Sequence, residues 1–93
     1  MFQTNEYFDG KVKSIGLESF EGKATVGVMA AGEYEFGTSC VEIMTVISGK
    51  LTILLPDEKE WKVFRKFDSF MVPKDSKFKV KAGEDTPYLC LYK

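Results

Sequence analysis

Glycine and proline break this chain into short segments, and this punctuation restricts the fold more than any other feature. The segments between the breaks are rich in Val, Ile, Phe, Tyr and Thr, and many alternate apolar with polar residues, as half-buried β-strands do. The clearest is 77–81, which places lysines on one face and Phe78 and Val80 on the other. The breaks are Gly10, Gly16, Gly22, Gly27, Gly32, Gly37, Gly49, Pro56, Pro73, Gly83 and Pro87.

No segment carries the apolar period of a helix, and we expect the charged stretch 56–60 to be a polar loop. Parallel strands need crossover connections, usually helical, so about nine short strands without helices predict an antiparallel fold. The chain has no internal repeat and no linker. We therefore expect residues 1–93 to form a single all-β domain, either an antiparallel sandwich or a small barrel.

The charge balance excludes two classes of partner. Thirteen Lys and Arg residues against fourteen Asp and Glu residues give a net charge of −1. This balance provides no electrostatic basis for binding a nucleic acid or a membrane surface. Arg65 is the only arginine, which leaves little capacity for bidentate recognition of phosphate or guanine.

The absence of histidine excludes still more chemistry. It removes Ser-His-Asp and Cys-His triads, histidine bases, and nearly all catalytic zinc and non-haem iron sites. Cys40 and Cys90 form no CxxC pair, and the first ten residues lack the basic and apolar regions of a secretory signal. The two cysteines could pair in a secreted protein, but we expect a cytoplasmic protein with two reduced, buried thiols.

Chain length and the N-terminal residues predict a homodimer. A domain of this size buries only about 60–65% of the surface that its unfolded chain exposes, so association adds useful stability. Phe2, Tyr7 and Phe8 precede the first clear strand, and three exposed aromatic rings are unusual in a free terminus. We expect the N-terminal strand at or near the dimer interface.

Glu42 is the polar residue that the alternation places among apolar ones. Met44 and Val46 share its parity along one segment, so all three side chains point to the same face. If that face is the core, a carboxylate is buried there, and desolvation would raise its pKa, as in a general acid or base. The alternative is that Glu42 lies at the mouth of the strand and meets water.

Two motifs resemble those of the cupins. Glu42 and Gly49, with six residues between them, match the second half of the first cupin motif, and Gly32 stands near the place of its opening glycine. Pro73, after the segment 69–72, resembles the proline of the second motif. The resemblance implies a cupin-like antiparallel β-barrel, a jelly-roll of about nine strands.

The chain departs from the cupin pattern at each histidine that binds the usual metal. Thr38 and Cys40 lie nearest the histidine positions of the first motif, and Phe78 occupies that of the second. Phe67 and Asp75 stand where the second motif has glycine. We therefore expect no metal and no other cofactor.

A narrower resemblance covers nearly the whole chain. Its most distinctive block is 42–49, Glu-x-Met-Thr-Val-Ile-Ser-Gly. The other blocks occur in order along the chain at matching spacing: 5–16, 26–29, 32–36, 54–57, Trp61, 72–73 and 88–92. Together they resemble the small cupin-type pyrimidine/purine nucleoside phosphorylases of bacteria. This family implies a cytosolic pentosyltransferase of the glycosyltransferase class, with inorganic phosphate as co-substrate. Phosphate attacks C1′ of a purine or pyrimidine nucleoside and releases the free base and α-D-ribose 1-phosphate.

The implied reaction needs three kinds of residue. A carboxylate can stabilise the oxocarbenium-like transition state, and aromatic rings can stack on any base. Cations, hydroxyls or backbone N–H groups near 37–39 can bind phosphate. The candidates are Glu42 and Thr45 for catalysis, Tyr34, Phe36, Phe70 and Phe78 for the nucleoside, and Lys13, Lys23, Arg65 and Ser39 for phosphate.

Plainer roles for these residues stay open. Each aromatic residue could be plain core, and Lys77, Lys79 and Lys81 could be a solvated strand face. The chain could also be a cupin module that binds a small molecule without chemistry, or a structural module that binds a protein partner.

Overall fold

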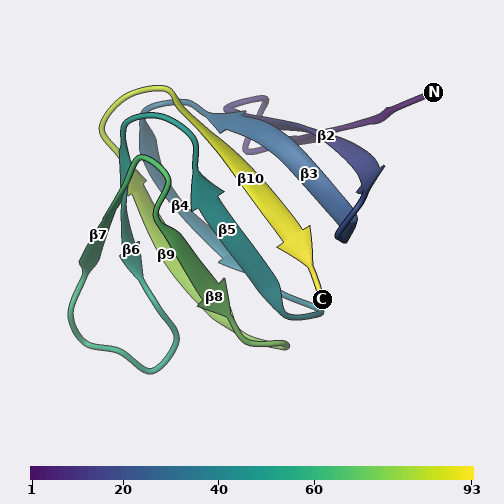
Figure 1. The fold of residues 1–93 in the computed structure, drawn as a ribbon. Helices are drawn as coiled ribbons and strands as arrows, with labels where there is room; N and C mark the ends of the chain where they lie inside the picture. The colour runs from purple at the N-terminus through teal and green to yellow at the C-terminus, as the bar shows by residue number, and fades with distance from the viewer.

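The computed structural model describes residues 1–93 and contains ten β-strands and no helix, which confirms the all-β prediction with one strand more than expected. Figure 1 shows them in chain order: β1 (Gln3–Tyr7), β2 (Val12–Ser19), β3 (Gly22–Met29), β4 (Gly32–Gly37), β5 (Glu42–Val46), β6 (Lys50–Leu54), β7 (Lys62–Arg65), β8 (Ser69–Val72), β9 (Lys77–Ala82) and β10 (Thr86–Tyr92). No helix of the chain is long and apolar enough to cross a membrane.

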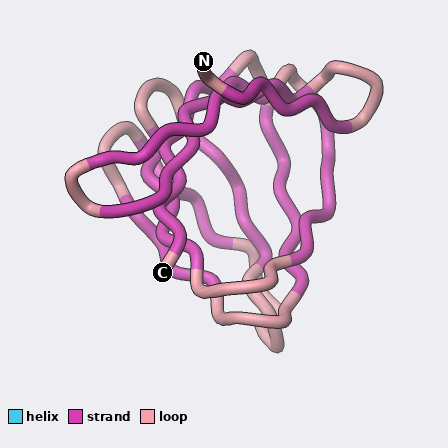
Figure 2. The backbone as a smooth tube through the Cα atoms, turned by 90° about the vertical axis from the view of Figure 1, so that its right-hand side faces the viewer, coloured by secondary structure: helices cyan, strands magenta, loops and turns pink.

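The strands form two antiparallel sheets. One has six strands in the order β1-β2-β3-β10-β5-β8, and the other has four in the order β4-β9-β6-β7. The expected barrel is therefore not closed, because no hydrogen-bonded pair of strands joins one sheet to the other. Figure 2 shows the strands arranged around a central space. Buried hydrophobic side chains lie in this space.

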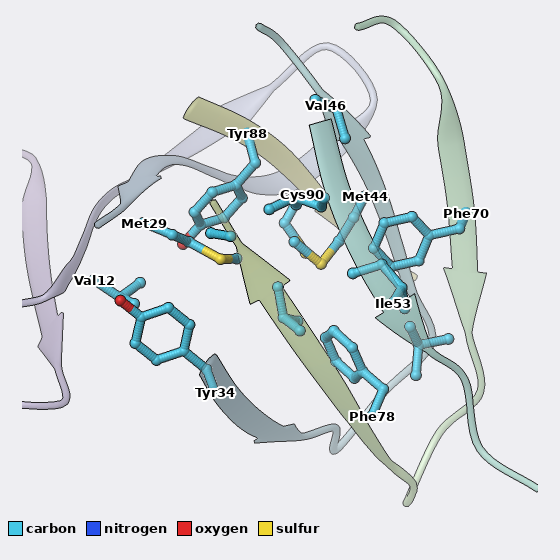
Figure 3. Packing of buried hydrophobic residues seen from close by; sticks show 14 residues of the cluster. Val12, Met29, Tyr34, Met44, Val46, Ile53, Phe70, Phe78, Tyr88 and Cys90 are labelled. Carbon is cyan, nitrogen blue, oxygen red and sulfur yellow. The ribbon is translucent and has the colours of Figure 1, made fainter. Parts of the chain in front are cut away.

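The inner faces of the two sheets form one hydrophobic core. Alternate residues of each strand point inward, as the period of a strand requires, and the core takes Met44 and Val46 from β5 and Phe78 and Val80 from β9. Figure 3 shows Met44 and Phe78 between the sheets, with the Phe78 ring directed toward Met44. The removal of apolar side-chain surface from water is the main source of the stability of this core.

The outer faces of the two sheets differ in character. On the six-stranded sheet, Ile15, Val26 and Leu89 lie side by side across β2, β3 and β10, and the first two are 47% and 42% exposed. Val28 and Met71, 47% and 62% exposed, extend this apolar outer face. The outer face of the four-stranded sheet instead pairs opposite charges across β4 and β9, such as Glu33 with Lys81 and Glu35 with Lys79.

Five non-glycine residues have a positive φ, and two of them stand at glycine positions of the cupin motif. Phe67 has φ of 70° and Asp75 has φ of 56°, and these are the two positions where the cupin motif carries glycine. A left-handed backbone conformation is unfavourable for a residue that has a side chain. The two turns nevertheless keep the backbone shape of the cupin motif, although they lack its glycines. The Phe67 turn is held by a hydrogen bond from the Phe67 N–H to the Val46 carbonyl, at 2.6 Å.

Candidate functional site

A cavity of about 390 Å³ opens between the two sheets and is lined by residues of both. We call it the inter-sheet cavity. The six-stranded sheet supplies mainly polar and sulfur-containing groups, and the four-stranded sheet with the β1–β2 turn supplies mainly aromatic rings. Its lining residues are Tyr7, Phe8, Ser14, Met29, Glu35, Phe36, Gly37, Glu42, Met44, Phe78, Tyr88, Cys90 and Tyr92.

Glu42 lies inside this cavity. It is the first residue of β5, and the parity that it shares with Met44 and Val46 directs all three inward, which is one of the two positions that the sequence left open. The side chain is half-buried rather than free in water. Burial raises the pKa of the Glu42 carboxyl above its ordinary value of 4.5, while the hydrogen bond from the Cys90 thiol, 3.4 Å from Oε1, acts in the opposite direction.

Strand β10 supplies the groups around Glu42. Burial raises the pKa of Tyr88 to about 12, and it raises the pKa of Cys90 and of Tyr92 far above their ordinary values. All three therefore stay protonated at neutral pH, and the Cys90 thiol acts as a donor rather than a nucleophile. The Tyr92 hydroxyl forms a hydrogen bond of 2.9 Å with the Thr25 hydroxyl.

Two of the four aromatic candidates line the cavity. Phe36 and Phe78 stack with ring centroids 5.6 Å apart and an interplanar angle of 29°. Tyr34 lies beside them but donates its hydroxyl proton to the Ala30 carbonyl at 2.6 Å, and Phe70 packs in the core against Phe78. Neither Tyr34 nor Phe70 lines the cavity, which corrects the expectation that all four reach the same site.

Thr45 is on the other face of β5. Its neighbours Met44 and Val46 are buried, whereas the Thr45 hydroxyl bonds the Ser69 hydroxyl at 2.7 Å in an exposed position. The expectation that Thr45 joins Glu42 in the site is not supported, because adjacent residues of a strand point to opposite faces.

The three predicted phosphate-binding cations lie outside the cavity. Lys13 is on the outer face of β2 and pairs with Glu6 at 3.2 Å, an exposed ion pair that contributes little stability. Lys23 lines a separate shallow hollow beside the N-terminal residues, and Arg65 is exposed on the edge strand β7. The structure does not bring these three side chains together with Glu42.

Ser39, the fourth phosphate candidate, does not line the cavity either. It is exposed in the loop between β4 and β5, two residues after the cavity-lining Gly37. The loop is anchored by Thr38, whose hydroxyl donates to the Pro73 carbonyl at 2.6 Å and accepts from the Ser76 N–H at 3.0 Å. Ser39 therefore sits on a fixed rim.

The residues at the cupin metal positions do not fit a metal ion. Thr38 uses its hydroxyl to anchor the rim, and Phe78 offers no ligand atom. Cys40 and Glu42 carry ligand atoms, but no cluster of three or more His, Cys, Asp or Glu side chains is placed to hold an ion. We derive no chemical step through a metal.

Several cavity residues were not predicted from the sequence. Tyr88, Cys90 and Tyr92 alternate along β10, and this pattern shows that they share a face. It does not show that Cys90 lies opposite Met44 and Tyr92 opposite Glu42, because the pairing joins segments almost fifty residues apart. Ser14 and Phe8 carried no sequence signal for the cavity.

Comparison with known proteins decides the family. The model of the pyrimidine/purine nucleoside phosphorylase family matches residues 2–92. The chain belongs to this family. A pyrimidine/purine nucleoside phosphorylase of Pseudomonas fluorescens is 59% identical over 93 residues, covering 100% of this chain and 99% of that protein.

Two solved structures have a fold similar to that of this member of the pyrimidine/purine nucleoside phosphorylase family. A protein of unknown function from Vibrio parahaemolyticus has a TM-score of 0.93 at 39% identity, covering 97% of this chain and 96% of its own. An RmlC-like cupin from Shewanella frigidimarina has a TM-score of 0.73 at 22% identity, covering 95% and 81% of the two chains. The cupin-like fold expected from the motifs is confirmed.

Proposed function

We propose that this chain catalyses phosphorolysis of purine and pyrimidine nucleosides without a metal. A phosphate oxygen forms a bond to C1′ while the C1′–N bond breaks, and its electron pair leaves with the base, which takes up a proton. The products are the free base and α-D-ribose 1-phosphate. The observation that carries the proposal is Glu42, a carboxylate held inside a cavity that faces stacked aromatic rings, in a member of this family.

The two walls of the cavity suit the two halves of a nucleoside. Phe36 and Phe78 offer a flat apolar surface to the base, and stacking on such a surface accepts purines and pyrimidines alike. Glu42 and the hydroxyls of Tyr88 and Ser14 offer polar groups to the ribose. In this pose the carboxylate of Glu42 stabilises positive charge as it develops on the ribose ring.

Phosphate binding is assigned to the rim. The carboxylate of Glu42 lies in the cavity and no Lys or Arg lines it, so the deep cavity is unfavourable for a phosphate anion. We propose that the hydroxyl of Ser39 and backbone N–H groups of 37–39 bind phosphate as it approaches C1′. Ser39→Ala should then raise the KM for phosphate and leave the KM for the nucleoside unchanged.

The activity is tested by incubating the protein with adenosine or uridine, with and without phosphate, and measuring the free base. Base release that requires phosphate supports phosphorolysis. A binding module without chemistry predicts a rise in melting temperature with nucleoside and no release of base. A structural module predicts neither, and either of the last two results would contradict the proposal.

We further propose a cytoplasmic homodimer that buries the apolar outer face of the six-stranded sheet. This face carries Ile15, Val26 and Val28 in exposed positions, whereas the outer face of the other sheet is covered by paired charges. Strand β1 is the edge strand of the same six-stranded sheet, which brings the N-terminal strand next to the interface. A second copy matches this face because a twofold interface sets one apolar patch against itself.

Light scattering at micromolar concentration tests the dimer. Val26→Glu should give a monomer, because it introduces two charges at the centre of the interface. Val63→Glu is the matched control, since Val63 is 46% exposed on β7 of the other sheet. A monomeric mass for the unaltered protein would contradict the proposal.

A further inference from the structure

The turn between β1 and β2 holds a bulky aromatic residue in an unfavourable backbone conformation. Phe8, Asp9 and Gly10 have φ of 54°, 57° and 84°, three consecutive left-handed residues. Glycine adopts this conformation freely, but a phenylalanine does not, and such residues persist only where their surroundings fix them. The conformation therefore marks Phe8 as a residue whose ring position is enforced.

The surroundings that fix the Phe8 ring are the aromatic residues of β4. Its centroid lies 5.0 Å from that of Tyr34 and 5.5 Å from that of Phe36, with the second pair at 90°. Phe36 in turn stacks on Phe78 at 5.6 Å. The rings of Phe8, Phe36 and Phe78 therefore form one continuous wall, with Phe8 at right angles to Phe36 at one end.

Phe8 lies at the mouth of the cavity. It lines the inter-sheet cavity, yet 43% of its surface remains exposed, and it also borders a shallow hollow on the outside, beside Trp61 and Lys81. One side of the ring thus faces cavity aromatics and the other faces solvent. An exposed, strained phenylalanine contributes less to the core than a buried one, so folding alone does not account for its position.

We propose that Phe8 is a specificity-determining residue of the nucleoside site, whose ring covers the base at the mouth of the cavity. This inference rests on the proposed function. With the ribose at Glu42, the base extends along Phe36 toward the mouth, where it meets the Phe8 ring. A purine has two fused rings and reaches further along this wall than a pyrimidine, so Phe8 favours purine nucleosides.

Steady-state kinetics of Phe8→Ala test the inference. We expect the KM for adenosine to rise about tenfold or more, with a smaller rise for uridine and a kcat within about threefold of the unaltered protein. The KM for phosphate should not change. Phe8→Tyr should restore the KM for adenosine, because it keeps the flat ring, whereas Phe8→Leu, similar in bulk but not flat, should not.

Two further variants separate contact with the base from effects on folding. Phe8→Gly also removes the ring but suits the left-handed backbone, so it should match Phe8→Ala in KM and exceed it in melting temperature. Phe20→Ala is the control, because Phe20 is fully exposed at the next hairpin turn and lines no cavity. A KM defect in Phe8→Ala that is absent from Phe8→Gly would assign Phe8 to loop stability and overturn the inference.

Calorimetric titration with adenosine in the absence of phosphate distinguishes failure of this inference from failure of the proposed function. If the unaltered protein turns over nucleosides and Phe8→Ala keeps its KM within about twofold, the inference is wrong and the function stands. If the unaltered protein binds adenosine without turnover, the function is wrong, and weaker binding by Phe8→Ala than by Phe20→Ala still supports a base contact. If the unaltered protein neither binds nor turns over adenosine, both are wrong.

Discussion

Replacing Glu42 by Gln separates the charge of the side chain from its volume. The amide has the same length, and its oxygen can still accept the hydrogen bond that the Cys90 thiol donates at 3.4 Å. No salt bridge joins Glu42 to a cation, so the change leaves no partner charge unpaired. We therefore expect the Glu42→Gln protein to fold.

The size of the cavity sets the magnitude of the kinetic effect. A sphere of 390 Å³ has a radius of about 4.5 Å, so a sugar carbon near the centre of the cavity lies roughly that far from the wall. At an effective dielectric constant of about 20 to 40, a carboxylate attracts a full positive charge at this distance by about 2 to 4 kcal/mol. Loss of that attraction predicts a fall in kcat/KM of about 30- to 800-fold.

The assay is release of free base from adenosine and uridine at saturating phosphate, with thermal unfolding measured on the same samples. Glu33→Gln is the matched control, because Glu33 is exposed on the outer face of β4 and does not line the inter-sheet cavity. A structural role for Glu42 predicts the opposite pattern, with activity retained and melting temperature lowered. A folded Glu42→Gln protein with kcat/KM within about threefold of the unaltered protein would refute the electrostatic role.

Three further predictions concern stability. Burial raises the pKa of Glu42, so the folded protein binds the carboxyl proton of Glu42 more tightly than the unfolded chain does. The free energy of unfolding of the protein should therefore fall as pH rises from 4.5 through the raised pKa. Glu42→Gln should remove this part of the pH dependence, measured by urea denaturation. Phe67→Gly should raise the melting temperature by about 2–4 °C, because glycine suits a φ of 70°, whereas Phe20→Gly, at a position without positive φ, should not; scanning calorimetry compares them. Gly27→Ala should lower the free energy of unfolding by about 2 kcal/mol, since its Cβ would lie 2.7 Å from the Lys13 carbonyl oxygen and from the Tyr88 hydroxyl. Gly83→Ala, with no atom within 4 Å of the new Cβ, should cost far less in the same denaturation assay.

Local alternation is enough to predict most strands and to place Glu42 on the same face as Met44 and Val46. The same rule excludes Thr45 from that face, because Thr45 stands between the inward Met44 and Val46. Strand β7 has a weaker pattern, because its four residues follow a polar loop and lie at a sheet edge, where three of them are exposed. The absence of barrel closure also lies beyond local patterns, since it depends on which strand edges pair.

The composition of the cavity could not be predicted from neighbouring residues. Cys90 reaches Glu42 only through the pairing of β5 with β10, and Phe8 reaches Phe36 only through the turn that follows β1. The phosphate-binding cations were suggested by residue type alone. No sequence pattern determines where the side chain of a long surface lysine points. The positive φ of Phe67 could not be predicted from its residue type either, although the cupin motif has a glycine at this position.

The Glu42 carboxylate and the lack of cations in the cavity bear on how the proposed reaction ends. A nucleoside enters this space without net charge, but ribose 1-phosphate carries a negative charge that the Glu42 carboxylate repels. The sugar product is therefore pushed toward the solvent as soon as the new bond forms. The same repulsion weakens rebinding of that product, so the cavity resists inhibition by accumulated ribose 1-phosphate while the overall equilibrium of the reaction stays unchanged.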